Sequence, residues 1–436
     1  MPRQLQARTV DRRRFLTGTA TAVGGAALAS RGMTGSAVAA GRAQDKTKVT
    51  FWFFSEWVAQ AVTAFNEKNP TIEVEFQQLS YPDVHNKLLT SLAAGSGAPD
   101  VVGIELGYVG TFASSGGLSD LNQAPFNAGS LVADLVDYKV QQGSTADGKL
   151  VLMPWDIAPG GIIYRADLLE QNGFDPDPAA LQEKIKSWDD WFAFGEEVKA
   201  KNGDLALMAD AFSDIFGTQV EQQGHGWFDG TKVVVEEKGT KPLQAAADVR
   251  QRGLDLKVDE GSPDWAASIR NDEYFGDAAA CWAEGGLKRE QPQTVGKWRA
   301  IRAPGPGFNI GGSFLAIPEQ SENQEAAWEF IKFLAGSTEG ALLGLREGGA
   351  FPSYKPSWKD KVFDEPVEFY GGQPTYRLWL DVAQGIPGAP IQPGEREASD
   401  IVNAEVTLVK QEDKDPTQAM KDAEAQVLKK IKGTTA

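Results

Sequence analysis

Short apolar runs alternate with amphipathic helical patterns between residues 48 and 104, and this alternation limits the folds open to the chain. Residues 48–54, 72–76 and 101–104 have the β-branched and aromatic content, or the strict alternation, that is typical of strands. Between them, the apolar residues of 57–65 and 84–92 recur at helical spacing. The resulting β-α-β-α-β order predicts a mostly parallel sheet with helices on both faces.

A second series of the same kind begins after residue 155 and predicts a second α/β lobe. Helix starts are marked by Ser55 and by Ser187, which has Asp190 three residues later as in a capping box. We predict strands at 161–164, 205–208, 232–236, 278–282, 298–301 and 311–318, and helices at 243–254, 327–334 and 419–431. The sequence shows no repeat of fixed period and no low-complexity linker, so short segments are expected to join the lobes.

The N-terminal residues carry the pattern of an export signal. Residues 11–16 read Asp-Arg-Arg-Arg-Phe-Leu, and a weakly apolar stretch then leads to Ala-Val-Ala ending at Ala39. This order is typical of a Tat signal peptide, which we place at residues 1–39, so we expect a soluble protein in the periplasm or outside the cell envelope. The single cysteine, Cys281, lies far from the cleavage site, so neither an intrachain disulfide nor a lipobox cysteine is expected.

The charge balance and the residue counts exclude several classes of partner. The chain carries 43 basic and 60 acidic residues, a net charge of −17, which disfavours nucleic acid and anionic lipid because both are polyanions. Histidine occurs twice and cysteine once, without the spacing of a metal site. We therefore expect no metal and no cofactor. We also expect a monomer.

Six segments follow one another in the order of a known family. They include Gly-Ile-Ile-Tyr-Arg-Ala-Asp-Leu-Leu at 161–169 and Ser-Trp-Asp-Asp-Trp at 187–191. The full set is 49–70, 92–102, 150–154, 161–169, 187–191, and 312–317 with 326–334. Together they resemble the family 1 extracellular solute-binding proteins, which include many sugar receptors of ABC importers. Arg165 departs from the asparagine that is usual after this tyrosine, which leaves the fold assignment intact.

The resemblance implies an α/β, periplasmic-binding-protein-like fold of type II, in which two lobes enclose a ligand cleft and the chain crosses between them three times. The crossings would lie near residues 156–160, 310–312 and 351–356. The implied lobes are residues 45–157 with 312–353, and residues 158–311 with 354–436. The implied function is the capture of a carbohydrate, a mono- or oligosaccharide, by hinge closure, and its delivery to the membrane permease subunits of an ABC importer.

A sugar receptor needs flat aromatic rings for the apolar faces of the sugar and polar groups for its hydroxyls. In α/β folds such groups gather beyond the carboxyl ends of strands and at chain crossings. Our candidates for ligand binding are Phe54, Ser55, Glu56, Glu105, Tyr108, Trp155, Asp156, Trp282, Glu284, Gly312, Ser313, Tyr376 and Trp379. Each could instead be a core ring or an ordinary surface acid. We expect Trp52 in the core, and Trp57, Trp191 and Trp328 in the core or on the surface.

Other functions fit the sequence less well. An exported glycoside hydrolase would need a marked acid–base pair, and other hydrolases a Gly-x-Ser-x-Gly elbow or a histidine cluster; the sequence marks none of these, so we do not expect an enzyme. A receptor for a polyamine or another small polar solute is the alternative, since aromatic rings and acids also bind cations. Gly305, Gly307, Gly311 and Gly312 lack the context of a dinucleotide loop and predict a hinge or turn.

Overall fold

The structure is a computed structural model that describes residues 46–145, 147–224, 226–388 and 391–435, all within one compact unit. The predicted signal peptide, residues 1–39, lies outside the described residues. None of the helices in the described part of the chain combines the length and the apolar character that crossing a bilayer requires.

The first sheet has five strands in the order β2-β1-β3-β11-β4. Its strands are β1 Thr47–Phe53, β2 Ile72–Gln78, β3 Val101–Glu105, β4 Met153–Pro154 and β11 Ser313–Ala316. β1 pairs in parallel with β2 and β3, as expected, whereas β11 is antiparallel to both β3 and β4. Since β11 re-enters this sheet after a long excursion, no local crossover forces it to be parallel.

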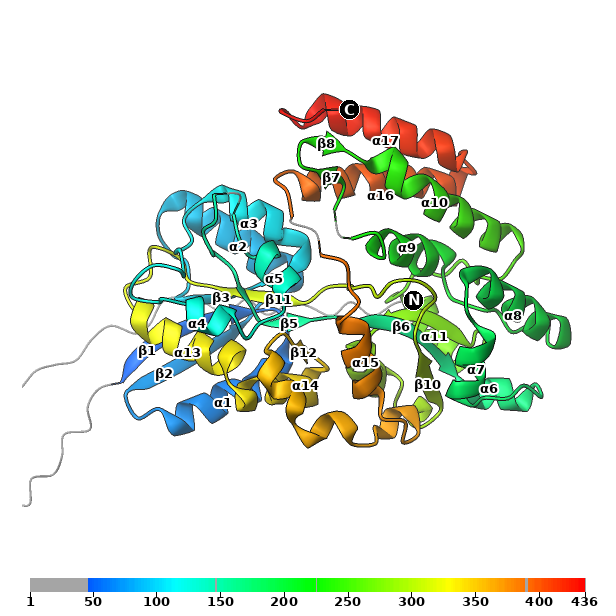
Figure 1. Cartoon of the computed structure of the whole chain (residues 1–436), viewed down its shortest axis with the longest axis horizontal. Helices are drawn as coiled ribbons and strands as arrows, with labels where there is room; N and C mark the ends of the chain where they lie inside the picture. Colours follow the sequence, from blue (N-terminus) through cyan, green and yellow to red (C-terminus); the bar gives the residue numbers. More distant parts are fainter. Residues whose placement is uncertain (1–45, 146, 225, 389–390, 436) are drawn as a thin grey trace, which may run out of the picture. The chain divides into compact units, whose positions relative to one another are not determined.

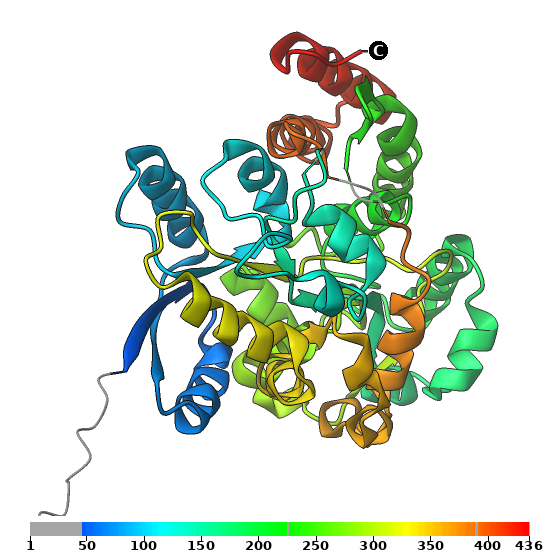
Figure 2. The same cartoon turned by 60° about the vertical axis from the view of Figure 1, so that its left-hand side comes forward.

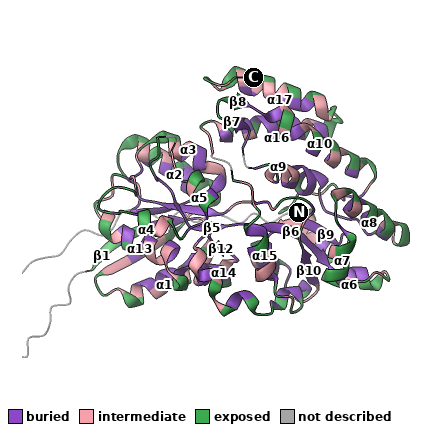
Figure 3. Cartoon of the chain, in the orientation of Figure 1, coloured by how far each residue is buried: buried purple, intermediate pink, exposed green. Residues whose placement is uncertain are grey.

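Side chains of β1 alternate between the two faces of this sheet, and each face has its own core. Helices flank the sheet (Figure 1), and its central strands β3 and β11 are buried (Figure 3). Phe51 and Phe53 belong to a core shared with helices α1 and α13, while Trp52 belongs to the core on the side of α2 and α3, as expected of a core residue. The helices of this region are α1 Ala59–Lys68, α2 Tyr81–Ala94, α3 Val109–Ser115, α4 Gly129–Val132, α5 Asp137–Gln142, α13 Gln324–Gly336 and α14 Thr338–Gly348.

Helix capping agrees with the sequence at one of the two predicted sites. Ser187 and Asp190 form the predicted capping box at the start of α8 (Trp188–Lys201). The prediction for Ser55 is wrong in its chemistry, because this residue precedes the short 3-10 helix η1 (Glu56–Val58) without a side-chain capping bond.

The second sheet has three strands in the order β10-β6-β9, and both pairings are antiparallel. Its strands are β6 Gly160–Arg165, β9 Gly276–Ala280 and β10 Trp298–Ile301. The predicted strand at 205–208 is wrong, since only isolated bridges from Ala206 and Met208 occur there. Where a strand is predicted at 232–236, the structure has the shorter strand β8 (Lys232–Val233), because helix α10 already begins at Val235.

A layer of helices packs beside the second sheet, and Figures 1 and 2 show α10, α16 and α17 running alongside one another. Met420, Ala423 and Val427 of α17 are fully buried in this core, as the amphipathic pattern predicts. The helices here are α6 Ala166–Gln171, α7 Pro178–Lys184, α9 Thr218–Glu221, α10 Val235–Gln251, α11 Pro263–Arg270, α12 Ala283–Glu290, α15 Thr375–Ala383, α16 Glu395–Glu412, α17 Pro416–Lys430 and the π-helix η3 Phe212–Gly217.

Three segments between the two sheets lie side by side. Strand β5 (Asp156–Ile157) pairs with β12 (Phe351–Pro352). The amide of Ile310 donates to the carbonyl of Ala158, at 3.0 Å, and the amide of Gly160 donates to the carbonyl of Phe308, at 3.1 Å. These are the segments expected to carry the chain between the lobes.

Candidate functional site

A cavity of about 820 Å³ lies against the second sheet. Its wall comes from the π-helix η3, from β9 and the start of α12, and from α16. Aromatic rings and acids both line it, namely Phe212, Phe216, Trp227, Trp265, Trp282, Asp210, Glu260 and Asp277. The cavity therefore offers flat apolar surfaces and hydrogen-bond acceptors to a small polar molecule.

Trp282 is the most open of these rings, with 46% of its surface exposed. It lies two residues after the end of β9, and its indole Nε1–H donates to the carbonyl oxygen of Ile310 at 2.9 Å. Because this bond fixes the edge of the ring, the exposed area is held in one orientation beside the cavity. Trp282 therefore has an exposed ring at the cavity, and its role in stacking stays a prediction.

The carboxylate of Glu105, the last residue of β3, lies near the indole of Trp282. A methyl group at Gly311 would lie 3.5 Å from Oε1 of Glu105 and 3.8 Å from Nε1 of Trp282, so the two side chains meet across this glycine. Oε2 of Glu105 accepts hydrogen bonds from the hydroxyl of Tyr81, at 2.8 Å, and the amide of Gly107, at 2.7 Å. These bonds orient the carboxylate and turn Oε1 toward Gly311.

The ring of His85 contacts both Tyr108 and the backbone of Glu105. Its ring stacks on Tyr108 with 3.8 Å between centroids and 1° between planes. Nδ1 lies 2.7 Å from the carbonyl of Tyr81, and Nε2 lies 3.1 Å from the amide of Glu105. A carbonyl only accepts and an amide only donates, so the imidazole is neutral, with its proton on Nδ1. Burial lowers the pKa of His85 to about 4.

This environment predicts the titration of His85. In an NMR pH titration, the His85 ring is expected to change charge near pH 4, and His85→Gln identifies its signal because the chain has only one other histidine. In the unfolded state the ring takes up this proton near pH 6.5. The free energy of unfolding is therefore expected to fall by ~3 kcal/mol as the pH falls from there to about 4. Urea unfolding of the wild type and His85→Gln measures the difference, and a ring that titrates near its ordinary pKa contradicts this placement.

Asp156, Gly312 and Ser313 gather around the connecting segments. The amide of Ser313 donates to Oδ1 of Asp156 at 2.9 Å. The buried ammonium of Lys139 lies 4.1 Å from the ring centre of Phe314, beside Gly312. Burial raises the pKa of Asp156 to about 6 and lowers the pKa of Lys139 to about 8, while their opposite charges partly offset both shifts. The group ties strand β5 to strand β11 of the first sheet and does not line the cavity.

Three predicted ligand-binding residues lie in cores instead of at the cavity. Trp155 is 3% exposed, and its ring lies 4.9 Å from that of Trp57 and 5.1 Å from that of Phe53. Trp379 is fully buried. Glu284 is also buried, and its carboxylate accepts a hydrogen bond from the ammonium of Lys288. Trp155 follows strand β4, whereas Trp379 lies on helix α15 (Thr375–Ala383), and in both cases the ring packs against other aromatic rings.

The remaining predicted residues lie at intermediate places. Phe54 is half-buried and packs on Tyr81, 5.3 Å between ring centres, which puts it beside the Glu105 group. Ser55 is half-buried and Glu56 is exposed at the start of η1. Tyr376 is half-buried against Phe363, 6.4 Å between ring centres, and does not line the cavity.

Most of the acids and rings around the cavity are missing from the sequence-based candidates. Asp277 gives the clearest signal, since it is a carboxyl inside the otherwise apolar strand β9. Asp210 follows a run of apolar residues, 205–209. Trp227 directly precedes the short strand β7 (Phe228–Asp229), and Trp265 lies in the short helix α11. A buried charge in an apolar run is the signal that could have pointed to the cavity.

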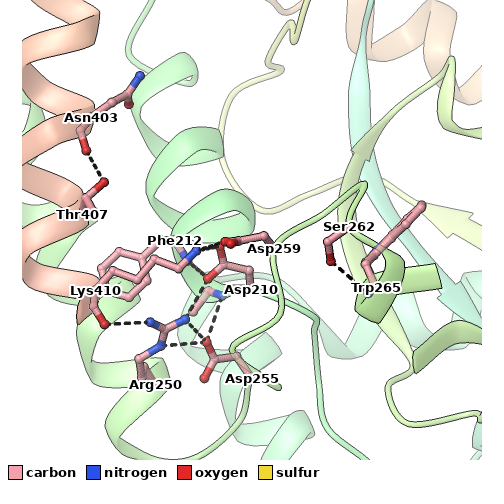
Figure 4. Close-up of polar contacts among 11 residues, drawn as sticks. Asp210, Phe212, Arg250, Asp255, Asp259, Ser262, Trp265, Asn403, Thr407 and Lys410 are labelled. Atoms are coloured by element: carbon pink, nitrogen blue, oxygen red, sulfur yellow. Dashed lines mark hydrogen bonds and ion pairs between the residues drawn. The ribbon is translucent and has the colours of Figure 1, made fainter. Parts of the chain in front are cut away.

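Buried ion pairs fix the wall of the cavity (Figure 4). Arg250 of α10 contacts Oδ1 of Asp210 at 2.8 Å and Oδ2 of Asp255 at 2.7 Å. Lys410 of α16 contacts Oδ2 of Asp210 at 2.7 Å and also pairs with Asp259. Both oxygens of Asp210 therefore face cations, and the network ties α10 and α16 to the start of η3.

Known proteins with a similar sequence are solute receptors. A family model described as bacterial extracellular solute-binding protein matches residues 60–366. The chain is 26% identical to the arabinooligosaccharide-binding protein of Bacillus subtilis (strain 168) over 88% of this chain and 93% of that protein. It is also 26% identical to the lactose-binding protein of Rhizobium radiobacter, over 82% of this chain and 87% of that one.

Solved structures agree on the fold. A crystal structure of an extracellular solute-binding protein of family 1 has a TM-score of 0.78 and 22% identity, covering 88% of this chain and 99% of that one. The ABC transporter associated binding protein from B. animalis subsp. lactis Bl-04, in complex with beta-1,6-galactobiose, has a TM-score of 0.74 and 21% identity, covering 90% and 99%. The fold is that of these two-lobed α/β proteins, as predicted. Since the family match spans well over half of the sequence and includes strands of both sheets, the chain belongs to the bacterial extracellular solute-binding proteins.

Proposed function

We propose that the chain captures a carbohydrate and delivers it to an ABC importer. Relatives support this proposal, because they include the arabinooligosaccharide- and lactose-binding proteins and, at 23% identity, a diacetylchitobiose binding protein. The observation that carries it is the pairing of the exposed, edge-fixed ring of Trp282 with the oriented carboxylate of Glu105. A sugar ring presents an apolar face to the first and hydroxyl donors to the second.

Hinge closure of two lobes is the mechanism that we propose for capture. The lobes would be residues 45–157 with 312–353, and residues 158–311 with 354–436. The paired segments at Asp156–Ile157, Phe351–Pro352 and residues 308–310 would bend, and a ligand that contacts both lobes would favour the closed form. The membrane permease would then recognise that form.

Export and assembly complete the proposal. Members of the family are extracellular, and we propose the Tat route for this chain because of the twin arginines in residues 11–16. We further propose that it acts as a monomer without a lipid anchor. The family consists of binding proteins rather than enzymes, so bound sugar is expected to be released unchanged.

A polyamine receptor is the second candidate. Asp210, Glu260 and Asp277 line the cavity together with several aromatic rings, and this combination also suits an organic cation. The ion pairs of Asp210 with Arg250 and Lys410 already match its charge, so the polyamine alternative rests on Glu260 and Asp277.

A thermal-shift screen tests the proposed ligand class. Mono- and oligosaccharides are expected to raise Tm, because a ligand bound only by the native state stabilises it by mass action, whereas polyamines are not. Trp282→Ala is expected to weaken the binding of the best sugar by about tenfold to a hundredfold, ~1.4–2.8 kcal/mol, since the stacking surface is lost.

Trp188→Ala is the matched control. The indole of Trp188 also donates a hydrogen bond, to Oε1 of Gln222 at 3.1 Å, but the ring does not line the cavity. Its loss is expected to leave sugar affinity unchanged at temperatures where both variants are folded. A Tm increase with polyamines alone would refute the carbohydrate proposal, and product formation would point to an enzyme.

A further inference from the structure

Three carboxylates come together at one side of the cavity. Asp214 comes from the π-helix η3, Asp277 from β9, and Glu260 from the segment before α11. One oxygen of each lies within 4.8 Å of one oxygen of the other two. The three segments are far apart in the sequence, so the cluster exists only in the folded chain.

The charges in this cluster are not matched by the protein around them. Asp214 is 1% exposed, and within the described part of the chain no cation and no ordinary donor hydrogen-bonds to its carboxylate oxygens, which face another acid, Glu260. Asp277 is 4% exposed; its Oδ2 accepts from the hydroxyl of Tyr274 at 2.9 Å, whereas Oδ1 also has no partner among the described residues. Burying unpaired carboxylates is costly, so these free oxygens call for a counter-charge.

Asp210 shows what a matched acid looks like in the same region. Its two oxygens contact Arg250 and Lys410, so its charge is balanced by the protein itself. Both cations are thereby engaged, and Lys410 also pairs with Asp259. The nearby cations thus pair with other acids, so the charges of Asp214 and Asp277 are neutralised either by protons or by a cation from outside the chain.

The cluster is accessible from the cavity. Glu260 and Asp277 both line the cavity, and Glu260 is exposed, whereas Asp214 lies behind them. Asp214 also belongs to a π-helix, a rare conformation that occurs frequently at functional sites. A cation could therefore enter through the cavity and contact one oxygen from each acid.

We propose that Asp214, Glu260 and Asp277 bind one hard divalent cation, Ca²⁺ by preference, in the wall of the cavity. The ligand set is carboxylate oxygen without histidine or cysteine, which suits Ca²⁺ or Mg²⁺ rather than Zn²⁺. A single ammonium group would balance only one of three negative charges, whereas a divalent ion balances two. Ca²⁺ also takes more ligands than three acids supply, so positions are left for water or for hydroxyls of a bound solute.

Calcium titration of the chelator-treated full chain, without any sugar, tests the ion site. Isothermal titration calorimetry with CaCl₂ is expected to give one ion per chain, with a Kd on the order of 10⁻⁴–10⁻³ M or tighter, and Tm is expected to rise with Ca²⁺. Tb³⁺ is a hard cation whose luminescence is excited by energy transfer from nearby indoles. Its luminescence is expected to increase on binding, because Trp265 lines the same cavity.

Variants separate an ion site from a merely structural cluster. Asp214→Asn and Glu260→Gln are expected to weaken Ca²⁺ binding at least about tenfold, because each removes one ligand charge. In EDTA, Asp214→Asn is also expected to raise Tm, since it relieves repulsion, whereas loss of a structural acid would lower it. Glu260 is exposed, so its variant keeps the test valid if Asp214→Asn fails to fold. Asp248→Asn, at an exposed acid of α10, is the control and is expected to bind Ca²⁺ unchanged.

Four outcomes would overturn the proposal: no stoichiometric Ca²⁺ or Mg²⁺ binding, binding of Zn²⁺ alone, binding that Asp214→Asn and Glu260→Gln leave intact, or binding of spermidine but not Ca²⁺ with the same dependence on the three acids. One part of the proposal, the contact between the ion and hydroxyls of a bound solute, rests on the proposed function. The ion site itself does not. Repeating the sugar screen in Ca²⁺ and in EDTA tests that link, and a failed sugar screen leaves the ion titration as an independent result.

Discussion

Arg250→Met is expected to lower the free energy of unfolding by about 3–5 kcal/mol, because it leaves two buried carboxylates without their partner. The side chain of Arg250 is 12% exposed, those of Asp210 and Asp255 are 5% and 0% exposed, and the contacts are 2.7–2.8 Å long. Methionine fills a similar volume but carries no charge, so Asp255 loses its guanidinium and Asp210 keeps only Lys410.

Urea unfolding of Arg250→Met beside Arg252→Met measures this effect. Arg252 lies two residues further along the chain, and its side chain and that of its partner Glu196 are 34% and 51% exposed. Exposed pairs contribute about 0–1 kcal/mol, so Arg252→Met is expected to stay within that range. Equal losses in the two variants would contradict the idea that burial of the Arg250 network sets its strength.

The sequence predicts helices and strands best where the pattern is local and strong. Residues 298–301 form a strand with the predicted bounds, and the capping box of Ser187 and Asp190 is present. The predicted strand at 205–208 fails because its apolar residues serve a buried irregular segment, and burial alone does not distinguish that from a strand. The antiparallel pairing of β11 depends on where the chain returns, which local periodicity does not record.

The site was predictable only in part, for a related reason. Trp282 and Glu105 could be found because Glu105 is the last residue of β3 and Trp282 lies two residues after β9, and ligand-binding side chains often lie beyond strand ends in α/β folds. Trp155 follows β4 in the same way, but the ring turns toward Phe53 and Trp57, and nothing local to Trp155 decides between the two directions. The Asp214 cluster joins three distant segments, so no window of the sequence contains it.

Gly312→Ala is expected to destabilise the chain by about 3 kcal/mol, because a side chain at this position is opposed by both the backbone conformation and the packing. Gly312 has a φ of +90°, which L-residues rarely adopt. A Cβ there would lie 2.6 Å from the carbonyl oxygen of Asp156 and 3.0 Å from Cα of Ile157. Both are backbone atoms of a connecting segment, so they cannot rotate away as a side chain could.

The measurement pairs Gly312→Ala with Gly203→Ala in urea unfolding. Gly203 has open space around its Cβ position and an ordinary φ, so its substitution is expected to change stability by no more than about 0.5 kcal/mol. If Gly312→Ala folds, β5 has to shift away from β11, which moves Asp156 from the amide of Ser313. Sugar affinity is then expected to fall as well, since the segments proposed to bend during capture are displaced. A Gly312→Ala variant with wild-type stability and affinity would show that these segments tolerate a side chain, and that the tight approach at Gly312 does not set the position of the hinge.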